Sequence, residues 1–119
     1  MKISILTLFP DMFSVFEHSI IGRATSKDII KIDTHNIRDF TLDKHRKVDD
    51  SPFGGGPGMV LKVEPIISAV NSVLKSKSKL KKRIILFSTR GKIFNQKTAK
   101  RLSGYDELIF ICGRYEGVD

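Results

Sequence analysis

Short apolar segments of strand length alternate along this chain with segments whose apolar residues recur at helical spacing. The strand-like segments span residues 3–9, 29–34, 84–87 and 108–112. Charged residues interrupt the segment 29–34, which places it nearer an edge of the sheet than the first strand. Strands that alternate with helices favour a mainly parallel sheet with helices on both faces, because parallel neighbours need a crossover connection. The sequence therefore predicts an α/β fold.

Three segments carry helical signals. Pro10 and Asp11 open a short helix, and we expect its inward face to hold Met12, Phe13, Val15 and Phe16. Residues 95–102 predict a helix capped by Asn95. Residues 63–74 predict a helix that packs on the sheet through one apolar stripe, formed by Val63, Ile66, Ile67, Val70, Val73 and Leu74. From residue 38 to 58 apolar periodicity is lost, and we interpret this stretch as one long functional loop.

The charge balance favours a polyanionic partner. The 119 residues are enough for one domain and carry a formal net charge of +8, with an isoelectric point of about 9.8. An excess of Lys and Arg attracts polyanions by counterion release and long-range steering. Nucleic acid is therefore the first partner to consider, although basic composition alone does not establish it.

Cysteine and histidine usage excludes several kinds of site. Cys112 is the only cysteine, so this chain alone forms no intrachain disulfide and no cysteine-based zinc site, and we expect a cytoplasmic setting. Cys112 ends an apolar strand with no neighbouring base and is expected to be a small buried hydrophobic residue. The three histidines lie far apart in sequence, so we predict no metal. The amino-terminal apolar run is too short for a membrane span, so we expect no membrane partner.

Two predicted strands end in loops suited to a ligand. Gly113 follows the strand 108–112 and begins Gly113–Asp119, where two glycines bracket Arg, Tyr and Glu. Ser88 to Gly91 follow the strand 84–87. Open α/β sheets bind ligands at the carboxyl ends of their strands, so the two loops could border one crevice. The alternative for Ser88 to Gly91 is an ordinary turn with Gly91 in a left-handed conformation.

A glycine-rich segment follows two aspartates. Residues 54–58 contain four glycines and Pro57, a composition that permits unusual backbone dihedrals. One interpretation is a flexible turn without a ligand. The other is a recognition loop, in which Asp49 and Asp50 accept hydrogen bonds from base edges and Phe53 supplies a stacking face. The common dinucleotide fingerprint Gly-x-Gly-x-x-Gly does not follow the first strand, which argues against that class of cofactor.

Four ordered motifs together resemble a known family. They are Leu8-Phe9-Pro10 with Met12-Phe13, Ile37-Arg38-Asp39-Phe40, Val48-Asp49-Asp50 with Pro52 to Met59, and Cys112 to Asp119. This set, which runs the length of the chain, is similar to the bacterial tRNA (guanine-N1)-methyltransferases. One departure is Thr89, followed by Arg90, after Ser88, where the family usually has Pro.

The resemblance implies a knotted α/β fold of the SPOUT class, a homodimer, and methyl transfer from S-adenosylmethionine to N1 of the guanine that follows the tRNA anticodon. The family's catalytic base is an Asp beyond Asp119, so no catalytic residue is assigned within these residues. Residues 1–119 are then expected to be the amino-terminal part of the methyltransferase domain. Without the second cofactor loop, the completed knot and the second domain, they are expected to be inactive alone.

The resemblance also assigns binding residues. The cofactor side would be formed by Leu86, Phe87, Ser88, Gly113, Tyr115, Glu116 and Gly117. The RNA side would be formed by Arg38, Lys44, Arg46, Asp49, Gly58 and Arg114. Arg38, Lys44 and Arg46 would meet phosphates, Asp49 would lie in the region that reads the guanine, and Arg114 would hold either RNA or the reacting groups. The alternative from a different class is a small basic RNA-binding module without transferase activity, which the net charge and the basic run Lys75–Arg83 support.

Overall fold

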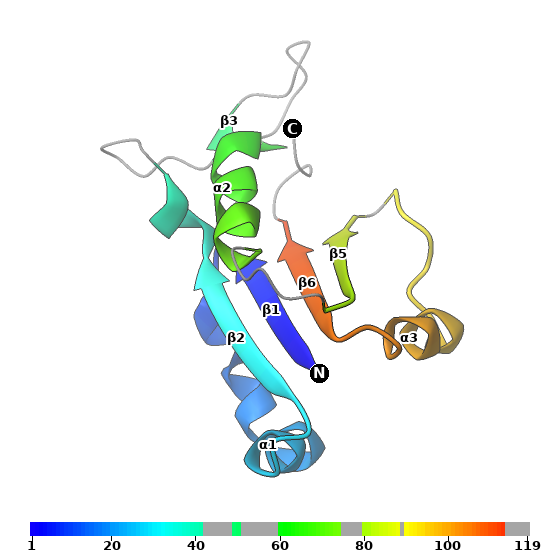
Figure 1. The fold of residues 1–119 in the computed structure, drawn as a ribbon. Coiled ribbons are helices and arrows are strands. Elements are labelled where there is room, and N and C mark those ends of the chain that lie inside the picture. The colour runs from blue at the N-terminus through cyan, green and yellow to red at the C-terminus, as the bar shows by residue number, and fades with distance from the viewer. Residues whose placement is uncertain (42–48, 51–59, 75–79, 89, 114–119) are drawn as a thin grey trace.

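The computed structural model describes residues 1–41, 49–50, 60–74, 80–88 and 90–113 (Figure 1). In chain order, its strands are β1 (Lys2–Thr7), β2 (Lys31–Asn36), β3 (Asp49–Asp50), β4 (Val60–Leu61), β5 (Lys82–Phe87) and β6 (Glu107–Cys112). The α-helices are α1 (Ser19–Ser26), α2 (Val63–Val73) and α3 (Gln96–Leu102), and the 3-10 helices are η1 (Pro10–Glu17) and η2 (Ile37–Phe40).

Strands β2, β1, β6 and β5 form one parallel sheet in that order. The first and last of these strands in sequence, β1 and β6, are central neighbours, and Lys2 pairs with both Lys31 and Glu107. Strand β2 lies at an edge, as its interrupting charges predict. The parallel α/β architecture expected from the alternation of elements is therefore confirmed.

Helices cover opposite faces of this sheet. Leu6 of β1 and Ile109 of β6 join one buried cluster with Ile66 and Ala69 of α2. Ile32 and Thr34 of β2 lie in register with β1 residues that point away from Leu6, and they face η1. Figure 1 shows α2 in front of β1, with η1 and α1 at the back of the sheet. The prediction of helices on both faces is thus confirmed.

Helix α2 turns a slightly different stripe toward the sheet than the sequence predicts. Ile66 is buried and Val70 packs against the core as expected, but Ile67 is 52% exposed. Pro65 and Ala69 are buried in its place. At 3.6 residues per turn, positions 66, 69, 70 and 73 share one side of the helix, whereas Ile67 is rotated about 100° from Ile66. The prediction for Ile67 is therefore wrong.

The predicted inward face after Pro10 is also partly wrong. Met12 is 73% exposed and Val15 is exposed, while Phe13 and Phe16 are half-buried, with ring centroids 5.7 Å apart. The cause is the type of helix, because η1 is a 3-10 helix with three residues per turn. Residues three apart lie above one another in such a helix. Phe13 and Phe16 therefore share one face, and Met12 and Val15 lie on another.

Helix α1 begins at a tight junction that the sequence analysis does not predict. Ser19 has a φ of 60° and turns the chain between η1 and α1. The turn folds Glu17 back over Gly22, where a Cβ atom would lie 2.3 Å from the Glu17 carbonyl oxygen. That distance is far below van der Waals contact, and the obstructing atom is backbone. Only glycine fits at this position without movement of the chain.

We expect Gly22→Ala to lower the free energy of unfolding by about 2 kcal/mol, because overpacking outweighs the gain in helix propensity of about 1 kcal/mol. Urea denaturation measures the change. Gly104→Ala is the matched control, since its Cβ would meet the Arg101 carbonyl oxygen at an ordinary 3.5 Å. A Gly22→Ala protein as stable as the control would contradict the close approach.

Helix α3 begins as the sequence predicts. The Asn95 side-chain oxygen accepts a hydrogen bond from the Thr98 backbone N–H at 3.0 Å. This bond satisfies a backbone donor that the first turn of a helix leaves unpaired. Leu102 is buried and anchors the last turn. Asn95 is therefore confirmed as the N-cap.

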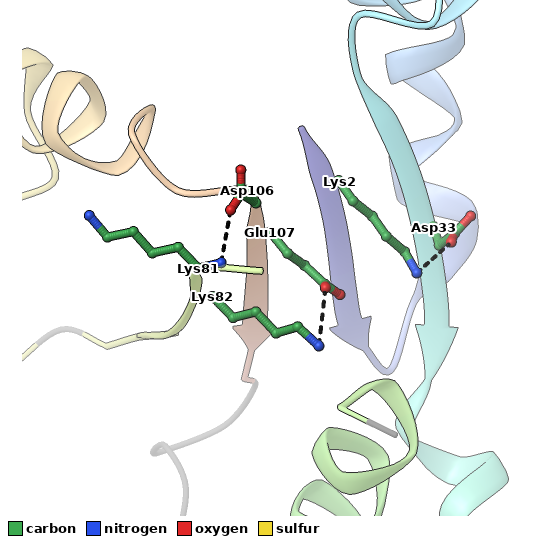
Figure 2. Close-up of polar contacts among 6 residues, drawn as sticks. All are labelled: Lys2, Asp33, Lys81, Lys82, Asp106 and Glu107. Atoms are coloured by element: carbon green, nitrogen blue, oxygen red, sulfur yellow. Dashed lines mark hydrogen bonds and ion pairs between the residues drawn. The ribbon is translucent and has the colours of Figure 1, made fainter. Parts of the chain in front are cut away.

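A buried ion pair joins the first residues of β5 and β6. Lys82 Nζ lies 3.6 Å from Glu107 Oε2, and the two side chains are 14% and 4% exposed (Figure 2). Glu107 Oε1 is buried without a hydrogen-bond partner. The neighbouring pair, Lys2 with Asp33, is 3.9 Å apart and lies in solvent. The amino-terminal end of the sheet thus holds one buried carboxylate, which depends on a single described cation.

Candidate functional site

The carboxyl ends of β5 and β6 lie side by side. Phe87 and Cys112 are register partners in these parallel strands, so Ser88 and Gly113 each follow directly at the same edge of the sheet. Gly113 is exposed and presents no side chain there. The structure therefore brings together Ser88 and Gly113, the first residues of the two loops that were expected to border one crevice, and residues 114–119 lie outside the described residues.

Leu86 and Phe87, the two β5 residues assigned to the cofactor, point in different directions. Leu86 pairs with Ile111 on the face that α2 covers, whereas Phe87 lies on the opposite face. Leu86 is 48% exposed and Phe87 is 40% exposed, so both remain accessible at the edge strand. A ligand on one face would meet only one of these two side chains, together with Ser88 and the backbone.

The Phe87 ring is held in place by other aromatic residues. It meets Phe110 edge-on with ring centroids 5.2 Å apart, and Phe94 lies 5.9 Å away in a tilted arrangement. Such contacts favour fixed ring orientations. Phe94 belongs to no motif in the sequence. It is only an apolar residue directly before Asn95, the N-cap of α3. The Phe87–Phe94 pair thus gives the carboxyl end of β5 a defined apolar surface.

Ser88 organises the loop that follows β5. Its hydroxyl oxygen accepts a hydrogen bond from the Arg90 N–H at 3.0 Å, and its carbonyl accepts one from the Gly91 N–H at 3.4 Å. Gly91 does not have a left-handed φ, so the alternative of an ordinary turn is wrong in the conformation it gives to Gly91. A Ser hydroxyl that caps a backbone N–H two residues later favours a tight turn at this place. Thr89 lies outside the described residues.

Cys112 is half-buried rather than buried, because it is the last residue of β6, at the carboxyl end of the strand. Burial raises the pKa of its thiol, so the neutral form dominates at neutral pH. Because the thiolate is the reactive form, the site gives this cysteine no activation as a nucleophile.

We expect Cys112 in the folded protein to react with iodoacetamide at pH 8 several-fold more slowly than free cysteine. A raised pKa lowers the thiolate fraction, and partial burial limits access of the reagent. Quenched time courses analysed by mass spectrometry measure the rate, and the urea-unfolded protein serves as the control. Reaction in the folded state faster than in urea would contradict the assignment.

Two residues assigned to RNA lie near the same end of the sheet. Arg38 belongs to η2, directly after β2, and its N–H donates to the Asn36 side-chain oxygen at 3.0 Å. Asp49 lies in β3 and pairs with Leu61 of β4, in an antiparallel ribbon that leads into α2. The interpretation of residues 38–58 as one long functional loop is therefore wrong at η2 and β3, and residues 42–48 and 51–58 lie outside the described residues. Local hydrogen bonds, rather than apolar periodicity, define these short elements.

The remaining predicted site residues lie outside the described part of the chain. On the RNA side they are Lys44, Arg46, Gly58 and Arg114, and on the cofactor side they are Tyr115, Glu116 and Gly117. Their assignments stay predictions.

A hollow of about 250 Å³ lies elsewhere in the fold, between η1, α1 and β2. Asp11, Phe13, Glu17 and Thr34 are among its lining residues, and it shares none with the predicted cofactor set. Within the described ranges, His, Cys, Asp and Glu do not gather in a group able to hold a metal ion. The helices in those ranges include none long and apolar enough to cross a membrane.

Comparison with known proteins places this geometry in a family. The whole chain, residues 1–119, matches the family described as tRNA (Guanine-1)-methyltransferase TrmD. The chain belongs to this TrmD family.

Individual TrmD relatives are similar along the full chain. The tRNA (guanine-N(1)-)-methyltransferase of Clostridium botulinum strain Hall is 56% identical over 119 residues, which cover 100% of this chain and 48% of the relative. That of Clostridium perfringens strain SM101 is 57% identical over 119 residues and is covered to 49%. The chain therefore spans about half the length of the curated TrmD relatives it matches.

A solved structure shares the fold. The crystal structure of a tRNA (m1G37) methyltransferase from Aquifex aeolicus superposes with a TM-score of 0.86 at 38% identity, covering 100% of this chain and 53% of the other. This similarity confirms the predicted SPOUT-like α/β fold class with its mainly parallel sheet.

Proposed function

We propose that the protein carrying this chain transfers a methyl group from S-adenosylmethionine to N1 of the guanine that follows the tRNA anticodon. The observation that carries the proposal is the match of all 119 residues to the TrmD family. Residues 1–119 would form the amino-terminal part of the methyltransferase domain, in a cytoplasmic homodimer. The family base, an Asp, would come from outside these residues.

The sheet edge fits such a cofactor. Ser88 and Gly113 follow neighbouring strand ends, where the hydrogen-bond ladder between β5 and β6 stops and a glycine admits close approach. Either Leu86 on one face of the sheet or Phe87 on the other would offer accessible apolar surface for an adenine ring. The sulfonium cofactor supplies an activated methyl group when bound. The residues of this chain would orient that group and exclude water, which are contributions of proximity and positioning.

The RNA side of the proposal uses the same end of the molecule. Arg38 in η2 and Asp49 in β3 both lie beyond the carboxyl ends of the strands, β3 through the ribbon that precedes α2 (Figure 1). Single-stranded loops expose base edges, and a carboxylate can accept a hydrogen bond from the exocyclic N2–H of guanine, which leaves N1 free to react. Arg38 would contact phosphate. A nucleotide held there would face the cofactor edge.

Methyl transfer to defined transcripts tests the proposal. The intact protein is mixed with tritiated S-adenosylmethionine and an unmodified tRNA whose anticodon is followed by guanine, and with a transcript carrying adenine at that position. We expect incorporation only into the first, and residues 1–119 alone are predicted to be inactive. Labelling of both transcripts, or of neither, would contradict the proposed function.

Cofactor titration distinguishes the methyltransferase from the alternative, a small basic RNA-binding module. Saturable binding of S-adenosylmethionine to the intact protein favours the enzyme. Binding of RNA without any binding of the cofactor favours the module.

We expect Asp49→Ala in the intact protein to lower kcat/KM for tRNA by about 10- to 100-fold, since one good base-edge contact contributes about 1–3 kcal/mol of discrimination. The Kd for S-adenosylmethionine should change less than about twofold, because Asp49 is assigned to the guanine and not to the cofactor. Asp33→Ala, which removes an aspartate from β2, is the control. Equal losses in tRNA and cofactor binding would contradict the assignment.

A further inference from the structure

Helix α3 presents a cationic outer face. Leu102 is buried, and Thr98 and Ala99 are half-buried, so these residues form the side that faces the rest of the protein. The opposite side carries three exposed cations, which are Lys97, Lys100 and Arg101. Their spacing of three and four positions places them together on the helix surface.

Helix stability does not account for this arrangement. Lys97 lies in the first turn, where the positive end of the helix dipole repels a cation, and that turn contains no acidic residue. Cations three and four positions apart also repel each other. Lys100 and Arg101 in the last turn suit the dipole, but Lys97 opposes it. The shared feature of the three residues is therefore their outward positive charge, which a bound anion would stabilise.

Nearby carboxylates are already engaged. Between residues 90 and 113 the acidic residues are Asp106 and Glu107. Asp106 Oδ2 accepts a hydrogen bond from the Lys81 N–H at 2.8 Å, and Glu107 is buried beside Lys82 (Figure 2). Among the described residues, no ion pair joins Lys97, Lys100 or Arg101 to a carboxylate. The cationic face is thus not neutralised within this part of the fold.

The positive charge extends toward the crevice. Arg90 and Lys92 are exposed in the segment that leads from the carboxyl end of β5 to α3. Figure 1 shows this segment running outside β5 down to α3. Phe94, near its end, is fixed against Phe87. The cations therefore follow one path along the β5 side of the sheet, rather than enclosing a single pocket, which suits a row of phosphates better than one small anion.

We propose that the outer face of α3, together with Arg90 and Lys92, binds the phosphate backbone of RNA away from the nucleotide held at the crevice. The identification of that RNA as tRNA rests on the proposed function. The binding itself is electrostatic, so it adds affinity that falls with salt and carries no base specificity.

The test compares two triple variants of the intact protein. Lys97→Gln/Lys100→Gln/Arg101→Gln neutralises the α3 face. Arg23→Gln/Lys27→Gln/Lys31→Gln neutralises three exposed cations at α1 and β2, on the opposite edge of the sheet. Each variant lowers the formal net charge by three. Filter binding to an unmodified tRNA transcript across a series of KCl concentrations gives the Kd and its salt dependence.

We expect the α3 variant to bind tRNA about 10- to 100-fold more weakly at 0.1 M salt, with a slope of log K against log salt smaller by about 2–3, since each lost phosphate contact contributes about 0.9. The control should keep the slope of the natural protein. Equal slopes for the two variants, or no change in the α3 variant, would overturn the proposal. If the triple variant fails to fold, Lys97→Gln alone should lower the slope by about 0.9. An unchanged slope in this single variant would overturn the proposal.

The outcome is separable from that of the proposed function. If methyl transfer fails but the α3 variant shows the expected smaller salt slope, the RNA-binding surface is supported and the methyltransferase activity is contradicted. If the natural protein transfers methyl groups but the two triple variants have equal slopes, the methyltransferase activity is supported and the RNA-binding surface is contradicted.

Discussion

Replacing Gly113 by valine is expected to raise the Kd of the intact protein for S-adenosylmethionine by about 100-fold, which corresponds to about 2.8 kcal/mol. Gly113 directly follows β6, beside Ser88, where the cofactor would approach the backbone. The added isopropyl group would occupy that space, and overpacking of a close contact costs about 1–3 kcal/mol. Isothermal titration calorimetry measures the change.

The matched control for this substitution is Gly104→Val. Gly104 precedes β6 at the opposite end of the same strand, and its Cβ would make an ordinary contact. We expect the control to bind the cofactor within about twofold of the natural protein. Equal weakening by both substitutions would indicate a general loss of stability and would remove Gly113 from the cofactor site.

Lys82→Met is expected to lower the free energy of unfolding by about 3 kcal/mol. The substitution keeps the length of the side chain but leaves the Glu107 carboxylate buried without its partner at 3.6 Å. An unpaired buried charge is costly, and removal of one member of a buried pair typically costs about 3–5 kcal/mol. The 14% exposure of Lys82 places the expected value at the low end of that range. Urea denaturation of the intact protein provides the measurement.

Two further variants identify the cause. Lys82→Met/Glu107→Leu removes both charges and should recover to within about 1 kcal/mol of the natural protein, because apolar residues of similar size replace buried pairs well. Lys2→Met removes a cation from the neighbouring strand, where the pair with Asp33 is exposed, and should change stability by less than about 0.5 kcal/mol. If the double variant is as unstable as Lys82→Met, the unpaired carboxylate is not the cause.

The sheet could be predicted because its strands carry the signal in their own residues. Ile109 and Ile111 lie in a continuous apolar run, and both are buried in β6. The edge position of β2 follows from charges that a central parallel strand would not tolerate. Asn95 reveals the start of α3 because its side chain acts on a backbone group three residues away. Each of these signals depends only on local sequence.

The parts that were missed depend on contacts between distant residues. Lys82 lies in the basic run Lys75–Arg83, before the predicted strand 84–87, and Glu107 precedes the apolar run 108–112. The two predicted strands therefore begin too late. Only the pairing of β5 with β6 brings these charges together. In the same way, the choice between a 3-10 helix and an α-helix after Pro10 changes which of Met12 and Phe13 is covered, and composition does not decide it.

The candidate site was predicted in part for a similar reason. The sequence places Ser88 and Gly113 each after a strand, and the general rule for open α/β sheets then directs both to one edge. That β5 and β6 are neighbours is a property of the topology. The opposite orientations of Leu86 and Phe87 follow from strand geometry once the register is known. Assignments to individual residues came from the family resemblance rather than from periodicity.

The central pairing of β1 with β6 has a consequence for synthesis. Lys2 and Glu107 are register partners although they lie 105 positions apart in the chain. At a translation rate of about 5–20 residues per second, β1 leaves the ribosome about 5–20 seconds before its partner has been made. During that interval Ile5 and Leu6, both buried in the finished sheet, have no β6 to pack beside. The nascent chain should therefore depend on chaperones most strongly just before β6 emerges.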